Sequence, residues 1–371
     1  MGDLRRESPP PRTSIDARRW MVLEQACKTA NLRRRTRSSA GPDLTLNSVR
    51  DYESGVLKVK KEIPGKRMDW RTTRIAVVSM ALVLMPLLGP GRALATWSIV
   101  AVDPDTHEVG VAVASCVSGV SITPILVPGK GAFIAQAMSN LKSKDVAARL
   151  MANGSTADEV LARVLDPTFD PEGRLINFGE GGPTGFIRFF GSNWRQYGVA
   201  TLSGDRRTAS FTGRSVPSWC GSAHDDRVSV QGNILRSGET VAEALKAFER
   251  RPPACVPTLA DRLMSALLAG AAAGGDRRCT KQWVAHSAYL AVAQPGDRLG
   301  EPSLSLTDDR QNRPGSVTSF LEQMAVEDSG DGGASPVVVL RNKYVAWAAQ
   351  HRNGTGACLT EPNAPWLSGA R

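Results

Sequence analysis

The clearest chemical signal in the chain is a threonine that directly follows a small-residue cleavage motif. Ala93-Leu94-Ala95 has the small-x-small pattern of a signal-peptidase site, and Thr96 comes next. Cleavage after Ala95 would place the Thr96 hydroxyl beside its own free α-amine. Because such an amine has a pKa of about 7.7–8.0, it can act as a base for the hydroxyl at physiological pH. The motif predicts an N-terminal nucleophile, unless a threonine follows the cleavage site by chance.

The segment before this motif has the parts of a secretory signal peptide. Arg71 and Arg74 precede the uncharged apolar run Ile75–Leu88. This run is shorter than the roughly 20 residues of a membrane-spanning helix, and Pro86 interrupts it. We therefore expect residues 68–95 to be a signal peptide and the protein to be periplasmic or secreted. The alternative is an uncleaved membrane anchor, in which Thr96 stays an amide and is inert.

Residues 1–67 are basic and show no clear hydrophobic period. They contain 16 Lys or Arg and 8 Asp or Glu, whereas residues 96–371 contain 27 of each. The formal net charge of +10 therefore belongs to the leader. Met68 stands where an initiator is expected, so we interpret residues 1–67 as a spurious extension, with a disordered cytoplasmic arm as the alternative. Since the body shows no basic face or nucleic-acid motif, nucleic acid is not an expected partner.

A hairpin positions the threonine against a serine. Residues 96–103 and 108–116 alternate and are rich in β-formers, and 104–107 has the composition of a turn. A two- or four-residue loop pairs Val102 with Val109 and Thr96 with Ser115, and paired residues share one face of a sheet. A three-residue loop would break this register. The small residues Gly110, Ala112 and Ala114 on one face indicate close packing under another layer.

The rest of the chain alternates strand groups with helix pairs. Further strands are expected at 131–136, 196–202, 208–212, 228–231, 286–293 and 303–306, and helices at 144–152, 156–165, 240–250, 258–272 and near 316–324; residues 167–193 are expected to be loop. Helix pairs between strand groups predict an α+β fold, a four-layer α-β-β-α sandwich over residues 96–325. Residues 326–371 carry weak signals and are expected to be an irregular tail.

The cysteines and histidines indicate disulfides rather than a metal site. Cys116, Cys220, Cys255, Cys279 and Cys358 would meet an oxidising compartment, so disulfides are permitted, with connectivity open and one cysteine left over. The four histidines are widely spread and no CxxC occurs. We therefore expect no metal and no cofactor. A Ser-His-Asp triad has no G-x-S-x-G elbow to support it.

Several motifs together resemble the bacterial domain-of-unknown-function family 1028. The opening Thr96-Trp-Ser-Ile-Val-Ala-Val-Asp-Pro-Asp and Glu108-Val-Gly-Val-Ala-Val-Ala-Ser115 carry the resemblance first. The further landmarks are Gly129–Ala137, Arg195–Val199, Ala209–Gly213, Val230–Leu235, Gly274–Cys279, His286–Leu290 and Gln294–Asp297. The resemblance covers roughly residues 96–325. It implies the α-β-β-α sandwich of the N-terminal-nucleophile (Ntn) hydrolases, without a known substrate.

Three positions match the site that this resemblance implies. Thr96 falls where Ntn hydrolases place the nucleophile, and Ser115 ends the Ala-x-Ala-Ser strand beside it. The Asn233 side-chain amide is a candidate oxyanion donor. The alternative for Asn233 is a residue that caps a turn at a strand end.

Three more polar residues are candidates with structural alternatives. Asp276 follows two glycines and could orient the Thr96 amine or a substrate, or could belong to a turn after Ala273. Gln136 is a candidate substrate-binding residue or a hydrogen-bonding residue of the core. Arg277, like Arg278, is solvated or binds a substrate carboxylate.

These residues predict a periplasmic or secreted Ntn-type amide hydrolase, activated by signal peptidase. The substrate would be a small-molecule, peptide or cell-wall-derived amide. The alternative function is a non-catalytic periplasmic binding or structural protein with the same fold. The oligomeric state is open, with a homo-oligomer among the possibilities.

Overall fold

The structure, a computed structural model, describes residues 96–170, 191–279, 283–309, 334–352 and 354–364. Residues 1–95, which hold the expected extension and signal peptide, lie outside the described residues. So do the helix expected near 316–324 and most of the loop expected at 167–193. All described residues belong to the unit that contains Ala93–Arg371.

Ten strands and five α-helices of four residues or more make up the described unit. The strands are β1 (Thr96–Asp103), β2 (Glu108–Ser115), β3 (Pro124–Val127), β4 (Gly131–Ala137), β5 (Arg195–Thr201), β6 (Thr208–Thr212), β7 (Gly221–His224), β8 (Val228–Asn233), β9 (Ser287–Ala293) and β10 (Leu304–Asp309). The helices are α3 (Lys142–Ala152), α4 (Ala157–Val164), α6 (Glu239–Glu249), α7 (Leu259–Ala272) and α9 (Pro336–His351).

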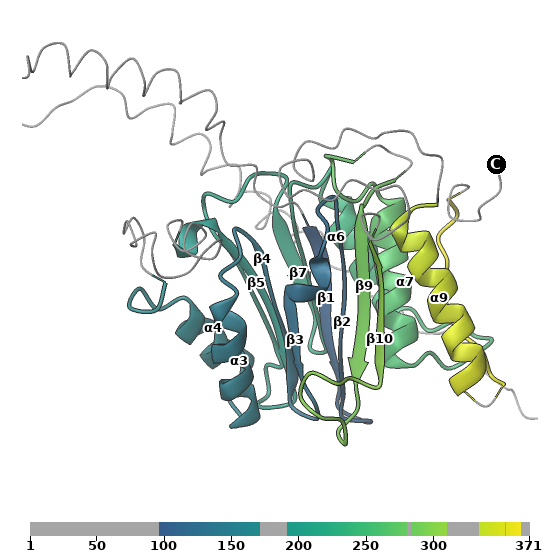
Figure 1. Cartoon of the computed structure of the whole chain (residues 1–371), viewed down its shortest axis with the longest axis horizontal. Helices are drawn as coiled ribbons and strands as arrows, with labels where there is room; N and C mark the ends of the chain where they lie inside the picture. Colours follow the sequence, from purple (N-terminus) through teal and green to yellow (C-terminus); the bar gives the residue numbers. More distant parts are fainter. Residues whose placement is uncertain (1–95, 171–190, 280–282, 310–333, 353, 365–371) are drawn as a thin grey trace, which may run out of the picture. The chain divides into compact units, whose positions relative to one another are not determined.

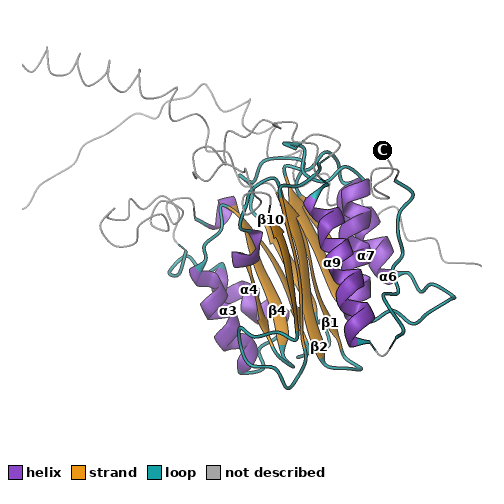
Figure 2. Cartoon of the chain, turned by 45° about the vertical axis from the view of Figure 1, so that its right-hand side comes forward, coloured by secondary structure: helices purple, strands orange, loops and turns teal. Residues whose placement is uncertain are grey.

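The strands form two antiparallel sheets. The larger, sheet A, has the order β10-β9-β2-β1-β8-β7, and the smaller, sheet B, has the order β3-β4-β5-β6. Helices α3 and α4 cover sheet B on one side, and α6, α7 and α9 cover sheet A on the other (Figures 1 and 2). The expected α+β class is confirmed.

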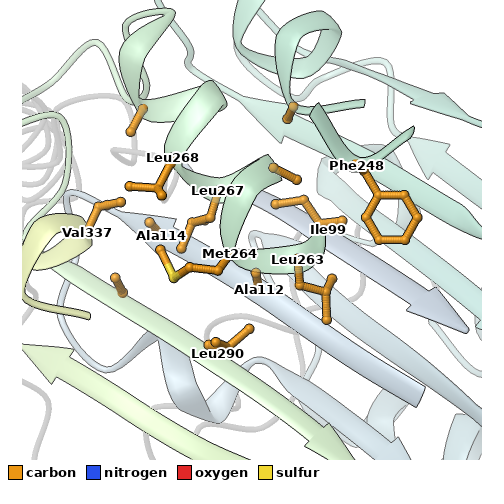
Figure 3. Close-up of a cluster of buried hydrophobic side chains, with 14 of the residues drawn as sticks. Ile99, Ala112, Ala114, Phe248, Leu263, Met264, Leu267, Leu268, Leu290 and Val337 are labelled. Carbon is orange, nitrogen blue, oxygen red and sulfur yellow. The ribbon is translucent and has the colours of Figure 1, made fainter. Parts of the chain in front are cut away.

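Separate apolar clusters fill the spaces between these elements. One buries Phe133 and Tyr197 of sheet B against helices α3 and α4. A second joins the two sheets through residues such as Val100, Val111 and Ile134. The third and largest lies between sheet A and its helices, where Leu263, Met264 and Leu267 of α7 meet the sheet (Figure 3). Strands β1, β2, β4 and β5 therefore alternate between two apolar layers, as two-sided burial requires.

The small residues on β2 let α7 approach the sheet closely, as expected. Ala112 and Ala114 lie under Leu263, Met264 and Leu267 in Figure 3. A Cβ atom at Gly110 would stand 2.5 Å from Leu263 Cδ1. Close packing of an interior leaves no room for that atom without displacement.

The predicted hairpin register is confirmed. Thr96 pairs with Ser115 and Val102 with Val109, across a four-residue turn at 104–107. Strand β1 is central and also pairs with β8, which places Thr96 opposite Asn233. Because faces alternate along a strand, Trp97 and Ile99 point to the helices and Thr96 and Ser98 point to sheet B.

The C-terminal tail differs from the expectation. We expected 326–371 to be irregular, but Pro336–His351 forms helix α9 on sheet A. The β-branched run Val337–Val339 has a low helix propensity, so the sequence does not indicate this helix. Burial of Leu340 and Tyr344 stabilises it. The short strands β3 and β7 are not predicted from the sequence, because four-residue strands carry little periodicity.

Asp261 fixes this tail to the domain. It is N3 of α7 and completes a capping box with Thr258. Its carboxylate also accepts hydrogen bonds from Tyr344 Oη at 2.8 Å, Arg352 Nη1 at 2.8 and 3.0 Å, and the Cys358 backbone N at 2.8 Å. A disulfide joins Cys255 to Cys358 beside this point. The tail is therefore an integral part of the helical layer over sheet A.

Candidate functional site

Thr96 begins the central strand at the end of sheet A and points between the sheets. It is 4% exposed, and Ser115 and Asn233, its partners on β2 and β8, are fully buried. Thr96 Oγ1 donates a hydrogen bond to Ser115 Oγ at 3.4 Å, and the Val117 backbone N donates to Ser115 Oγ at 3.1 Å. The structure therefore brings together Thr96, Ser115 and Asn233, three of the residues singled out from the sequence.

Polar side chains replace the apolar core between the sheets at this end. Ser98 Oγ donates to Gln136 Oε1 at 2.7 Å, and Gln136 Nε2 donates to Gln196 Oε1 at 2.7 Å. Asn233 Nδ2 also donates to Gln196 Oε1, at 3.0 Å. Gln231 Nε2 donates to Ser98 Oγ at 2.6 Å. We call Ser98, Gln136, Gln196, Gln231 and Asn233 the amide cluster.

The amide cluster is a buried polar network in which one acceptor, Asn233 Oδ1, has no hydrogen-bond partner in the described part of the chain. All five of its residues are at most 1% exposed. Burying polar groups in an interior lowers stability unless each is hydrogen-bonded, and an apolar core continues between the same sheets nearby. The network places amide donors and acceptors beside Asn233, the cross-strand partner of Thr96. Gln136, a candidate for substrate binding, lies within the network and bonds to Ser98 and Gln196.

Gln196 is a member of the cluster that sequence reasoning missed. It lies in the Arg195–Val199 landmark and on the face of β5 that points to sheet A, with Gly198 and Ala200. A Cβ atom at Gly198 would stand 2.3 Å from Gln231 Oε1, so this glycine makes room for the Gln231 amide. A glutamine on an otherwise small and apolar inner face was the signal available in the sequence.

Asp276 lies in the loop after α7 and holds an arginine beside the site. Its carboxylate is fully buried and accepts from the Cys116 backbone N at 2.8 Å and the Arg278 backbone N at 3.0 Å. Arg278 Nη2 and Nε add bonds of 2.7 and 3.2 Å. These four bonds use the acceptor positions of a carboxylate. Asp276 therefore orients Arg278 in this structure, and no bond from Asp276 to Thr96 occurs among the described residues.

Arg278, rather than Arg277, is the cation turned toward the site. Arg278 Nη2 lies 3.5 Å from Ser115 Oγ, and its side chain is 25% exposed. Arg277 is exposed, and its backbone N donates to the Ile234 carbonyl. A disulfide joins Cys116, which follows Ser115, to Cys279, which follows Arg278. This crosslink fixes the arginine loop against the end of β2.

Backbone strain gathers around the same residues. Ala137 follows Gln136 with φ 63°, and Ile234 follows Asn233 with φ 49°. Val284, whose carbonyl accepts from the Asp276 backbone N, has φ 49°. A positive φ is costly for β-branched residues and persists where the surroundings impose it, most often at functional sites.

The described residues offer no group of three His, Cys, Asp or Glu side chains placed to hold a metal ion. A search of the same residues finds no helix with the length and apolar character to cross a membrane.

Comparison with known proteins identifies a family and gives a structural likeness. The model of a family of unknown function, DUF1028, matches residues 96–178 and 188–316, which is more than half of the chain. No curated protein matches it. The crystal structure of a DUF1028 protein from Silicibacter pomeroyi is similar at 19% identity and a TM-score of 0.47, over 70% of this chain and 88% of that one.

Proposed function

The chain belongs to the family of unknown function DUF1028, and from that premise we propose that it is an Ntn-type amide hydrolase with Thr96 as its nucleophile. The observation that carries the proposal is the place of Thr96. Its hydroxyl is hydrogen-bonded to Ser115 at the end of the central strand. The buried amide cluster and Arg278, which is paired with Asp276, lie beside this point. A purely structural strand end would not require a buried acceptor without a partner, Asn233 Oδ1, opposite the threonine.

The order of the layers supports the same proposal. Helices α3 and α4, sheet B, sheet A and helices α6, α7 and α9 follow one another, with an apolar cluster at each of the three junctions. This order agrees with the four-layer α-β-β-α sandwich of Ntn hydrolases. In that arrangement the nucleophile stands at the start of a central strand, as Thr96 does on β1.

Activation requires cleavage of the chain after Ala95. We propose that signal peptidase removes residues 68–95 and releases the protein to the periplasm or the exterior. The disulfides Cys116–Cys279 and Cys255–Cys358 support an oxidising compartment, where such bonds form and persist. Cleavage turns the Thr96 amide nitrogen into an α-amine, which a chain with an intact leader does not have.

The proposed reaction has two steps. Thr96 Oγ attacks the carbonyl carbon of a substrate amide while the α-amine takes the hydroxyl proton. The tetrahedral intermediate then breaks its C–N bond, and the α-amine returns that proton to the leaving nitrogen. The same amine then deprotonates a water molecule, which attacks the carbonyl carbon of the Thr96 ester. The bond between that carbon and Thr96 Oγ breaks, the amine returns the proton to Thr96 Oγ, and the acid is released.

Three neighbours assist this chemistry. Ser115 Oγ lies 3.4 Å from Thr96 Oγ1. In the processed protein, where the Thr96 hydroxyl turns its proton to the α-amine, the Ser115 hydroxyl can donate to Thr96 Oγ1 and orient it. Asn233 commits one N–H of Nδ2 to Gln196, so the second N–H can donate to the oxyanion. Arg278, behind Ser115, adds positive charge where negative charge develops. The substrate class in this proposal is a small-molecule, peptide or cell-wall-derived amide.

The test combines the mature N-terminus with covalent labelling. Mass spectrometry of the exported protein should find a chain that begins at Thr96. A β-lactone should then acylate Thr96 in that protein and fail to label a Thr96→Ala variant of normal fold. A mature chain that begins elsewhere, or equal labelling of the variant, would overturn the proposal in favour of a binding protein.

A further inference from the structure

The orientation of the Gln196 amide is dictated by backbone carbonyls. Its Nε2 donates to the Gly232 carbonyl at 2.9 Å, the Gly221 carbonyl at 3.3 Å and Thr212 Oγ1 at 2.8 Å. A carbonyl oxygen only accepts hydrogen bonds, so the NH₂ end of the amide must face these groups. Gln196 Oε1 must therefore point the other way, into the amide cluster.

This orientation decides which end of Asn233 faces Gln196. Gln196 Oε1 is an acceptor, so Asn233 must present Nδ2 to it, as it does at 3.0 Å. Asn233 Oδ1 is then turned away from Gln196. It is buried and has no hydrogen-bond partner in the described part of the chain. An unpartnered buried acceptor is rare in folded proteins and calls for a donor.

Thr96 is the residue placed to supply that donor. It is the cross-strand partner of Asn233, and side chains of such partners lie about 5 Å apart at Cβ. While residue 95 is attached, the Thr96 nitrogen carries one N–H. After cleavage it becomes an amine with two N–H groups, or three when protonated. Processing thus creates new donors across from an acceptor that has none.

We infer that Asn233 Oδ1 accepts a hydrogen bond from the α-amino group of Thr96 in the processed protein, and that Gln196 is the positioning residue that turns Oδ1 toward it. This inference rests on the proposed function, because it needs Thr96 to be N-terminal. It is separate from the oxyanion role, which uses the second N–H of Asn233 Nδ2. The bond fixes the orientation of the α-amino group, so that its nitrogen lone pair can face the threonine hydroxyl.

The groups around Thr96 make the effect of this bond measurable. Its cross-strand partners Ser115 and Asn233 are neutral, and so are Gln196 and Gln136, which continue the network from Asn233. The charged groups beyond Ser115 are Arg278 and Asp276, which form an ion pair with each other. A hydrogen bond donated by the amine to Asn233 Oδ1 should favour the charged ammonium form and raise the pKa of the amine.

The first measurement uses the unmodified processed protein. The side-chain ¹³Cγ resonance of Asn233 should shift with pH along the same titration curve as the Thr96 α-¹⁵N resonance. Acetylation of the α-amine should abolish both shifts. An Asn233 resonance that does not follow the amine would overturn the inference.

Variants provide a second, signed measurement of the amine pKa. Asn233→Ala should lower it by about one unit, and Asn233→Asp should raise it, because a carboxylate favours the ammonium. Gln196→Leu should lower it too, since Asn233 then loses its orientation. Thr212→Val is the matched control and should leave it unchanged, because two carbonyls still hold Gln196 Nε2. Shifts of the same sign in Asn233→Ala and Asn233→Asp would refute the acceptor role.

The two proposals fail in different ways. A mature chain that does not begin at Thr96 overturns the proposed function and this inference together. A chain that begins at Thr96, reacts with a β-lactone, and shows no coupling of Asn233 to the amine overturns this inference alone. Coupling in a protein without turnover would support the inference and contradict the hydrolase.

Discussion

Thr96 and Ser115 stand directly opposite each other on β1 and β2, and the Thr96 hydroxyl donates to the Ser115 hydroxyl across 3.4 Å. Both side chains point into the space between the two sheets, where Asn233 and the other members of the amide cluster also lie. The pair places a potential nucleophile and its orienting partner on adjacent strands, which hold side chains more precisely than loops do.

Replacement of the threonine tests the nucleophile directly. Thr96→Ala should lower kcat for any amide substrate by several powers of ten, because only binding and oxyanion stabilisation remain. Thr96→Ser should retain part of the activity, since a primary hydroxyl beside the same amine can still attack. Steady-state kinetics on proteins of equal thermal stability would measure both effects. Wild-type activity in Thr96→Ala would move the chemistry elsewhere.

The pH dependence of turnover reports the base. The rate should rise with pH through an apparent pKa at or above that of a free α-amine, about 7.7–8.0, because only the neutral amine takes the hydroxyl proton and the bond to Asn233 favours the charged form. Acetylation of the amine should remove activity while leaving the fold intact. A rate that is flat across this range, or an active acetylated protein, would exclude the amine as base.

Gln196→Leu should destabilise the protein as well as change the site. The substitution removes the acceptor of both Gln136 Nε2 and Asn233 Nδ2, which stay buried. Two unsatisfied donors should cost about 2–6 kcal/mol of unfolding free energy. Denaturant unfolding would measure this loss, with Ser210→Ala as control, because Ser210 of β6 bonds to Ser222 of β7 at a half-buried place outside the amide cluster. If Gln196→Leu lowers the unfolding free energy less than Ser210→Ala does, the buried donors of Gln136 and Asn233 do not depend on Gln196 Oε1.

Asp261→Ala should loosen the C-terminal tail. It removes the common acceptor of Tyr344, Arg352 and the Cys358 backbone and leaves a charged guanidinium without its partner. Breaking such a buried pair costs about 3–5 kcal/mol. The exposed pair Arg206–Asp158 supplies the control, since Asp158→Ala should change stability by about 0.5 kcal/mol or less. Chemical denaturation with the disulfides intact compares the two, and equal losses would contradict the anchoring role.

The local parts of the site could be predicted from the sequence. Alternation over residues 96–103 and 108–115, joined by a short turn, determines the β1–β2 register, because the two strands are neighbours in the chain. The same reasoning predicts that Thr96 and Ser115 share a face. The capping box at Thr156 likewise marks the start of α4, since a helix cap depends on residues three positions apart.

Only the tertiary structure decided which distant residues lie beside Thr96 and Ser115. Asn233 meets Thr96 through β1–β8 pairing, and Gln196 meets Asn233 through the stacking of two sheets. In the loop after α7, Asp276 selects Arg278 over Arg277 through contacts with the end of β2. These contacts join segments far apart in the chain, and a periodic pattern describes only which face of its own strand or helix a residue occupies. The partner on the facing layer is chosen by packing, which no local pattern contains.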